Sequence, residues 1–270
     1  MKSDGSLENR FGPVYIMGGM RGRGFDFERE GRGMIAKRLI GFDLDGTLSQ
    51  HKTPIGETNR QVLEKLAQRY RLVMVGAGAC SWIYAQLREF PIEIIGNYGL
   101  QRSVIRDGRF EIVEDRVCEV DKDRVEALVS GLRKKFHLEN FVGDNVEFHA
   151  SGAVTFPLLG TKARLEDKLV CDPDRKKRRT MYADVCKAFA GYNVFIGGAS
   201  SFDITPAGYD KYHALVKFCR DNGMTPEEVV YVGDDFGEGG NDSQVRLGGI
   251  DCIEIKDYRM FPEKVAHLLR

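Results

Sequence analysis

Two carboxylates, Asp43 and Asp45, directly follow the largely apolar run 39–42. This run predicts a short buried strand, and residues i and i+2 of a strand point the same way, so both acids leave its C-terminal end together. Gly46 then permits a sharp turn, and Thr47 adds a hydroxyl beyond it. One interpretation is a polar turn with only local hydrogen bonds. Because adjacent acids repel unless a cation compensates, and because ligands bind outside the carboxyl ends of strands in open α/β sheets, we predict a reactive site.

A second acidic cluster consists of Asp234, Asp235 and Asp242, around a glycine-rich turn that follows the apolar run 229–232. Carboxylate oxygens are the hard ligands that Mg²⁺ prefers. The alternative is an acidic loop exposed to solvent. Because Asp43 is expected at a neighbouring strand end, the two clusters together predict a Mg²⁺ site.

Lys211 stands at the start of a predicted helix with Leu215 and Phe218 on its apolar face. A cation at a helix N-terminus is unfavourable for the helix dipole, so its presence indicates a compensating negative charge nearby. The alternative is a solvated surface lysine. We expect Lys211 to supply the cation that the acids require.

The turn formed by Gly76, Ala77 and Gly78 lies between the buried run 71–75 and a predicted helix. Such a turn can present backbone N–H groups to a phosphate. The alternative is that the glycines only let the helix approach the strand. None of the three residues has a hydroxyl, so we expect phosphate contact through the backbone alone.

Strand and helix patterns alternate over residues 37–101 and again over 205–270, which predicts a parallel sheet covered by helices. In residues 102–204 the runs 109–114 and 145–150 instead alternate apolar and polar positions, as in a sheet with one covered face. A helix begins after Asp121, and residues 162–179 are predicted to form a charged loop. We therefore predict a second α/β domain, 102–204, inserted into the first.

Residues 1–36 differ in composition from the rest of the chain and contain several Arg-Gly repeats with acids interspersed. A segment of this kind buries too little apolar surface to offset its ordering entropy, so we expect a flexible N-terminal extension.

The charges are balanced, with 40 Lys plus Arg against 40 Asp plus Glu, so nothing in the composition favours nucleic acid or an anionic membrane as a partner. No apolar run approaches the roughly 20 residues that cross a bilayer. The 6 cysteines are scattered without a CxxC pair, which is typical of buried thiols in a reduced compartment. We expect a cytoplasmic protein.

The stretch Asp43-Leu-Asp-Gly-Thr47 resembles the DxDGT signature of the haloacid-dehalogenase (HAD) superfamily of phosphotransferases. The resemblance implies a Rossmann-like parallel-sheet core with an inserted α/β cap. It implies that Asp43 is the nucleophile that forms an aspartyl-phosphate, that Asp45 is the general acid/base, and that Lys211 holds nucleophile and phosphate together. Asp234 would be the principal second Mg²⁺ ligand. The full predicted metal set is Asp43, Asp45, Asp234, Asp235 and Asp242.

A narrower resemblance lies in residues 195–211, which look like the IGGxxSFDxxPxGxDK stretch of the eukaryotic-type phosphomannomutases. It implies that Ser201 and Asp203 hydrogen-bond the hydroxyls of a hexose phosphate, and that a hexose bisphosphate acts as activator. Without the resemblance, both would be ordinary polar residues at a strand end. The family also implies a homodimer through the cap, although the sequence itself leaves the oligomeric state open.

The predicted cap departs from that family where a distal phosphate would be bound. His149 and Thr161 stand where the family has arginines. Lys162, Arg164 and Lys168 are then predicted to hold the distal phosphate, less specifically than an arginine fork would. The alternative is that these three residues belong to a solvated loop.

Two enzymatic functions follow from the same acids. One is a phosphohexomutase that interconverts hexose 1-phosphate and hexose 6-phosphate. The other is a sugar-phosphate phosphatase, in which water resolves the aspartyl-phosphate; the two differ in what reaches the phosphoenzyme. A third interpretation, a sugar-phosphate binder without activity, is opposed by the presence of both Asp43 and Asp45.

Overall fold

The structure is a computed structural model that describes residues 35–270. The predicted flexible extension lies, up to residue 34, outside the described residues. Within residues 35–270 the strands form two sheets, one of seven strands and one of four.

The seven-stranded sheet has the order β11-β10-β1-β2-β3-β4-β5. Its parallel strands are β1 (Leu39–Phe42), β2 (Arg71–Val75), β3 (Glu93–Gly96), β10 (Val229–Gly233) and β11 (Asp251–Glu254). The edge is antiparallel, with β4 (Gln101–Arg106) and β5 (Arg109–Asp115). This mostly parallel sheet confirms the predicted α/β class.

Alternating side chains of β1 supply the two faces of this sheet. Ile40 and Phe42 belong to a cluster with residues of α1 (Glu57–Ala67), α2 (Cys80–Gln86) and α8 (Phe261–Lys264). Leu39 packs instead with residues of α6 (Lys211–Asp221) and α7 (Ser243–Leu247). Helices therefore cover both faces, as expected for a buried parallel sheet. The short 3-10 turns are η1 (Asn97–Gly99), η2 (Pro226–Glu228), η3 (Tyr258–Met260) and η4 (Ala266–Leu269).

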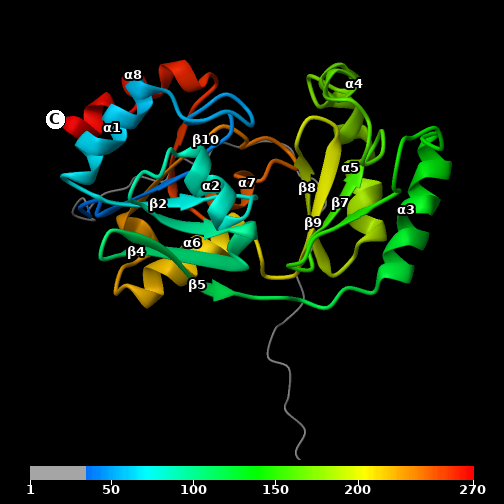
Figure 1. The fold of residues 1–270 in the computed structure, drawn as a ribbon, viewed down its shortest axis with the longest axis horizontal. Coiled ribbons are helices and arrows are strands. Elements are labelled where there is room, and N and C mark those ends of the chain that lie inside the picture. Colours follow the sequence, from blue (N-terminus) through cyan, green and yellow to red (C-terminus); the bar gives the residue numbers. More distant parts are fainter. Residues whose placement is uncertain (1–34) are drawn as a thin grey trace, which may run out of the picture. The chain divides into compact units, whose positions relative to one another are not determined.

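The four-stranded sheet is antiparallel and has the order β6-β7-β9-β8. Its strands are β6 (Glu147–Phe148), β7 (Val154–Pro157), β8 (Tyr192–Gly197) and β9 (Ser201–Pro206). Two helices, α3 (Lys122–Phe136) and α5 (Lys176–Ala188), pack beside it and share its hydrophobic core (Figure 1). The remaining helix of this segment is α4 (Leu165–Cys171).

Two predictions about these elements are wrong. Residues 109–114 form β5 of the first sheet and do not belong to the second, because β4 and β5 extend the first sheet from β3. The boundary predicted at residue 102 therefore lies inside the first sheet, and the second sheet's segment can begin only after Asp115. Residues 162–179, predicted as a loop, contain α4 and the start of α5.

The predicted starts of two helices are confirmed. The side chain of Asp121 accepts a hydrogen bond from the backbone N–H of Arg124, so α3 begins where predicted. Asp210 caps α6 in the same way, through the N–H of His213. These contacts place Lys211 in the first turn of α6.

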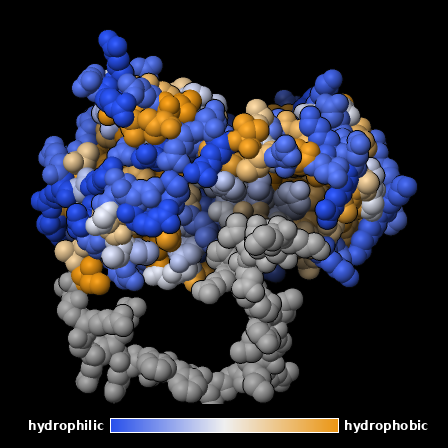
Figure 2. All heavy atoms as spheres, turned by 90° about the horizontal axis from the view of Figure 1, so that it is seen from below, coloured by the Kyte–Doolittle hydropathy of each residue, from blue (hydrophilic) through white to orange (hydrophobic). Residues whose placement is uncertain are grey.

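No helix of the described residues is long and apolar enough to cross a membrane. Where residues 35–270 are visible in Figure 2, hydrophilic residues predominate and hydrophobic ones lie in small groups.

Candidate active site

Lys211 and Asp43 meet at the C-terminal end of β1. The Lys211 Nζ lies 2.6 Å from Asp43 Oδ1, 2.7 Å from Asp242 Oδ1 and 3.0 Å from Asn241 Oδ1. Its side chain is fully buried. Burial alone would lower the pKa of Lys211, but Asp242 and Asp43 outweigh it and hold the pKa above its usual value. Lys211 is therefore the buried cation that compensates the negative charges of Asp43 and Asp242.

Asp242 stabilises this arrangement through its hydrogen bonds. Its Oδ1 accepts from Lys211 and from the Tyr231 hydroxyl at 2.7 Å, and its Oδ2 accepts from the backbone N–H groups of Asp234 and Asp235 at 3.1 and 3.0 Å. Burial raises the pKa of this carboxyl, but Lys211 and the other donors lower it further, so the net shift is downward. Asp242 is thus an ionised support with both oxygens already occupied.

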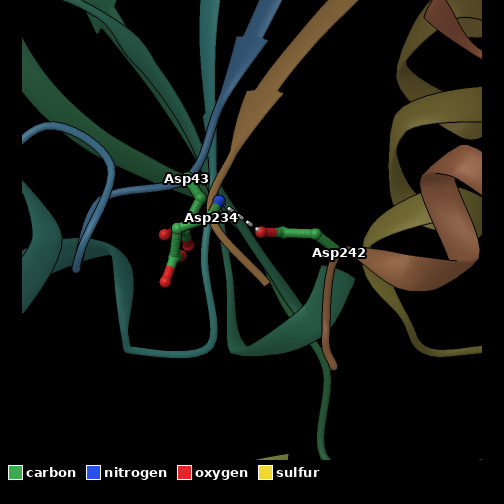
Figure 3. Close-up of side chains that lie close together, drawn as sticks. All are labelled: Asp43, Asp234 and Asp242. Carbon is green, nitrogen blue, oxygen red and sulfur yellow. Dashed lines mark hydrogen bonds between the residues drawn. The ribbon is translucent and has the colours of Figure 1, made fainter. Parts of the chain in front are cut away.

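Asp43 and Asp234 belong to a group of acids that could hold a metal ion. Figure 3 shows their carboxylates side by side, with Asp242 pointing toward the backbone nitrogen of Asp234. One carboxylate oxygen from each of the three acids lies within 4.8 Å of the other two. Burial, together with the neighbouring acids Asp43 and Asp242, raises the pKa of Asp234 to about 8. A set of hard oxygen donors with excess negative charge fits Mg²⁺.

The pKa of Asp43 is raised to about 6, mainly by burial, while Lys211 opposes the rise. The Asp43 Oδ1 is engaged by Lys211, and Oδ2 accepts from the Thr47 hydroxyl at 3.3 Å. Gly46 is required nearby, because a Cβ at this position would meet Asp234 Oδ2 at 2.6 Å and its φ is +88°. The turn after β1 can therefore approach Asp234 closely.

Asp45 lies in the same cavity as Asp43, as the strand alternation predicts. Its Oδ1 accepts from the backbone N–H of Lys52 at 2.7 Å, and its Oδ2 lies 3.7 Å from His51 Nδ1. Burial lowers the pKa of His51, against the influence of Asp45. Asp45 is held at the cavity wall rather than against the other acids.

The cavity has a volume of about 410 Å³ and is bounded by residues that follow strands of the first sheet and by residues of β8 and β9 of the second. Gly76, Ala77 and Gly78 line it. The Gly76 N–H donates to the carbonyl of Ile95 at 2.9 Å. Phosphate contact at this turn would therefore fall to the N–H groups of Ala77 and Gly78.

The two predicted sugar-binding residues lie differently. Asp203, on β9, lines the cavity and accepts from the hydroxyls of Tyr98 at 3.0 Å and Thr155 at 3.3 Å. Burial raises the pKa of Asp203, and its hydrogen-bond donors oppose this rise. The Ser201 hydroxyl donates to the carbonyl of Gly197 at 3.0 Å, and Ser201 is not among the described residues that line the cavity.

The three predicted cap cations are not brought to the cavity. None of Lys162, Arg164 and Lys168 is among the described residues of its wall. Arg164 makes a bidentate pair with Asp167, at 2.9 and 3.0 Å, and Lys168 Nζ donates to the carbonyl of Thr161 at 3.3 Å. Local partners in the same segment satisfy these two side chains.

Two other arginines line the cavity instead. Arg178 is buried and donates from Nε to Asp172 at 2.7 Å and from its terminal nitrogens to carbonyls of the β8–β9 turn, namely those of Gly197, Gly198, Ala199 and Ser201. Arg178 therefore supports the fold. Arg175 forms an ion pair with Asp235, which ties this predicted metal-side acid to a cation of the second sheet's segment. Burial raises the pKa of Asp235, and Arg175 opposes the rise.

Sequence reasoning missed Arg175, Arg178, Tyr98, His51 and Asn241. Asn241 could have been found, since it directly precedes Asp242 in the glycine-rich turn. Arg175 and Arg178 lie in a dense run of charges in which no periodicity distinguishes one cation from the next.

Comparisons with known proteins agree with this geometry. Residues 59–248 match the model of the eukaryotic phosphomannomutase family. The chain is 26% identical over 233 residues to the phosphomannomutase of Encephalitozoon cuniculi, covering 77% of this chain and 84% of the relative. It is 25% identical over 219 residues to phosphomannomutase 1 of Homo sapiens, covering 76% and 81%.

Solved structures with the same fold include a haloacid dehalogenase-like hydrolase from B. subtilis, with a TM-score of 0.59, 15% identity and coverage of 86% of this chain and 98% of that one. N-terminally truncated IMP-nucleotidase of Plasmodium falciparum has a TM-score of 0.61 at 13% identity, with coverage of 86% and 70%. These likenesses concern the fold. Together with the family match, they show that the chain belongs to the eukaryotic phosphomannomutase family and is a HAD enzyme of the phosphohexomutase or phosphatase type.

Proposed function

We propose that this chain transfers the phosphoryl group of a phosphorylated sugar through an aspartyl-phosphate on Asp43, interconverting hexose 1-phosphate and hexose 6-phosphate as a phosphomannomutase does. The observation that carries the proposal is the position of Lys211, which neutralises one oxygen of Asp43 and fixes the carboxylate at the cavity. A hexose 1,6-bisphosphate is proposed as the activator. A homodimer through the second sheet's segment stays a prediction.

The chemistry follows from the two acids of the β1 turn. The Asp43 carboxylate attacks phosphorus, and the ester bond between phosphorus and the sugar oxygen breaks. Asp45 gives its proton to the departing sugar oxygen, then takes one from the sugar hydroxyl that next attacks the aspartyl-phosphate. In this second attack the bond between phosphorus and the Asp43 oxygen breaks, and Asp43 leaves as a carboxylate. Lys211 keeps Asp43 oriented throughout. Mg²⁺ held by Asp43 and Asp234, with Asp242 supporting them, would neutralise charge on the transferring phosphoryl group.

Substrate recognition is assigned to Asp203 and Arg175. Asp203 presents a carboxylate to the cavity and can accept hydrogen bonds from sugar hydroxyls. Arg175 is the cation whose position supports contact with a second anionic group of the substrate, because the Arg178 donors are already engaged. The predicted distal-phosphate role of Lys162, Arg164 and Lys168 has no structural support, because none of the three is among the described residues that line the cavity.

A sugar-phosphate phosphatase is the second candidate, and the placement of these three cations favours it. A mutase must retain a doubly phosphorylated intermediate, which requires a firm hold on the phosphate remote from Asp43. Because Arg175 also pairs with Asp235, it would hold this remote phosphate more weakly than an arginine fork free of other partners. Water would then resolve the aspartyl-phosphate.

One assay separates the two functions. The protein with Mg²⁺ is incubated with mannose 1-phosphate or glucose 1-phosphate, with and without the hexose 1,6-bisphosphate, and hexose 6-phosphate and free phosphate are measured. Isomerisation that depends on the bisphosphate supports the mutase, and release of phosphate alone rejects it in favour of the phosphatase.

Asp43→Asn tests the covalent intermediate. It should abolish either activity, and near-full turnover would refute the aspartyl-phosphate. Asp184→Asn is the matched control, because Asp184, on α5, pairs with Lys135 of α3 and is not among the described residues of the cavity wall.

A further inference from the structure

The Tyr98 hydroxyl is a hydrogen-bond donor to the cavity carboxylate of the second sheet. It donates to Asp203 Oδ2 at 3.0 Å. Tyr98 belongs to η1, which follows β3 of the first sheet, whereas Asp203 lies on β9. A side chain next to the first sheet therefore holds a carboxylate of the second sheet.

The Tyr98 side chain is fixed by its surroundings. Its ring stacks on Phe195 of β8, with centroids 4.9 Å apart and planes 9° apart. The residue is almost fully buried, and its φ of +56° is a left-handed conformation that is unfavourable for a bulky side chain. Asn97, directly before it, also has a positive φ of +48°. The backbone is therefore strained at Tyr98, whose hydroxyl reaches Asp203 from this conformation.

The hydrogen bond from Tyr98 has a physical consequence for Asp203. With Tyr98 on Oδ2 and Thr155 on Oδ1, the Asp203 carboxylate cannot rotate freely. A carboxylate that must accept hydrogen bonds from particular sugar hydroxyls gains selectivity when its oxygens are fixed in advance.

We propose that Tyr98 is a positioning residue for sugar recognition, which orients the Asp203 carboxylate toward the cavity. The inference rests on the proposed function, since it assumes that Asp203 receives a sugar. Tyr98 itself has no part in phosphoryl transfer. When its hydroxyl is removed, Lys211 keeps Asp43, Asp242 and Asn241 as acceptors.

Tyr98→Phe provides the test, because it keeps the ring and its stack on Phe195 and removes only the hydroxyl. Activity is measured on mannose 1-phosphate with the bisphosphate activator, and on acetyl phosphate, a phosphoryl donor without a sugar. Loss of a hydrogen bond to a charged group predicts a fall in kcat/KM of about 10- to 100-fold on the hexose phosphate. Hydrolysis of acetyl phosphate should stay within about twofold of wild type.

Two further variants sharpen the comparison. Tyr84→Phe is the matched control, because Tyr84 also stacks on a phenylalanine, Phe110, and is not among the described residues of the cavity wall. It should leave both activities unchanged. The double variant Tyr98→Phe/Asp203→Asn should be no worse on hexose phosphate than Asp203→Asn alone, because Tyr98 acts through Asp203.

The proposal is overturned if Tyr98→Phe uses hexose phosphate as well as wild type does. Equal losses on both substrates, or effects that add in the double variant, would also overturn it and would assign Tyr98 to the phosphoryl site or to the fold. Wild-type protein that hydrolyses acetyl phosphate and no hexose phosphate would reject the proposed function first and this inference with it.

Discussion

The Lys211 Nζ lies 2.6 Å from Asp43 Oδ1, although 168 positions separate the two residues in the chain. The pair is formed because parallel β1 and β10 are neighbours, and α6 begins beside their carboxyl ends. Lys211 also bonds Asp242, so one buried ammonium serves two buried carboxylates.

Replacing Lys211 should destabilise the fold as well as abolish activity. Lys211→Met leaves Asp43 and Asp242 buried without their cation, and breaking a buried pair costs about 3–5 kcal/mol. Urea unfolding should show a loss of that order in the free energy of unfolding. Lys217→Met is the control: its partners Asp221 and Glu114 are both partly exposed, so the loss should stay below about 1 kcal/mol for each pair.

The source of that loss can be checked with a second substitution. Lys211→Met/Asp242→Asn should recover part of the lost stability, because one of the two uncompensated charges is removed. A Lys211→Met variant as stable as wild type would contradict the ion-pair account.

Mg²⁺ should stabilise the protein through Asp43 and Asp234. A ligand that binds only the folded state at 100 times its Kd adds about 2.7 kcal/mol. We expect calorimetry to show a higher Tm in Mg²⁺, which chelation with EDTA reverses. Asp234→Asn should lose most of the shift, whereas Asp221→Asn, at a partly exposed ion pair on α6, should keep it. An undiminished shift in Asp234→Asn would place the ion elsewhere.

The burial of Asp203 predicts a pH-dependent gain in stability for Asp203→Asn. The folded-state pKa is raised above the unfolded value of about 3.9. Between the two pKa values the folded state retains a proton that the unfolded state has lost, so wild-type stability falls as the pH rises through this window. Above both pKa values, the destabilisation caused by burying the ionised Asp203 carboxylate is fully present.

The amide variant avoids this cost. Its advantage in Tm over wild type should be largest at neutral pH and should shrink as the pH is lowered toward about 4. Asp184→Asn, at an exposed ion pair, serves as the control. An advantage that grew on acidification would contradict the sign of the pKa shift.

Features set by neighbouring residues could be predicted from the sequence. Asp43 and Asp45 share a strand end because side chains alternate, and Asp121 and Asp210 cap helices through N–H groups only three residues away. Residues 109–114 show where this approach fails. Their alternation predicts a strand, but the choice of partner strand depends on pairing across the fold, which the pattern does not contain.

Charged side chains show the same limit within the site. Arg164 and Arg175 are alike in the sequence, yet Arg164 pairs with Asp167 in the helix that it precedes, and Arg175 pairs with Asp235 just after β10. Tyr98 shows the same limit, because its hydroxyl donates to Asp203, which lies 105 positions further along the chain. Such contacts are created by the tertiary fold.

Arg175, rather than the predicted cations, should determine the affinity for a second anionic group. Arg175→Met removes a charged donor from the cavity wall, so KM for the hexose bisphosphate should rise by about tenfold or more. The combined variant Lys162→Ala/Arg164→Ala/Lys168→Ala should stay within about twofold of wild type, because those side chains are not among the described residues of the wall.

Asp235→Asn should act in the opposite direction and lower KM, because Asp235 competes with the substrate for Arg175. Steady-state kinetics with the bisphosphate checks all three variants under one condition. If the triple variant raised KM as much as Arg175→Met, the distal phosphate would be held by the loop cations after all. If Asp235→Asn raised KM, the carboxylate would be supporting the bound substrate, and competition for Arg175 would be excluded.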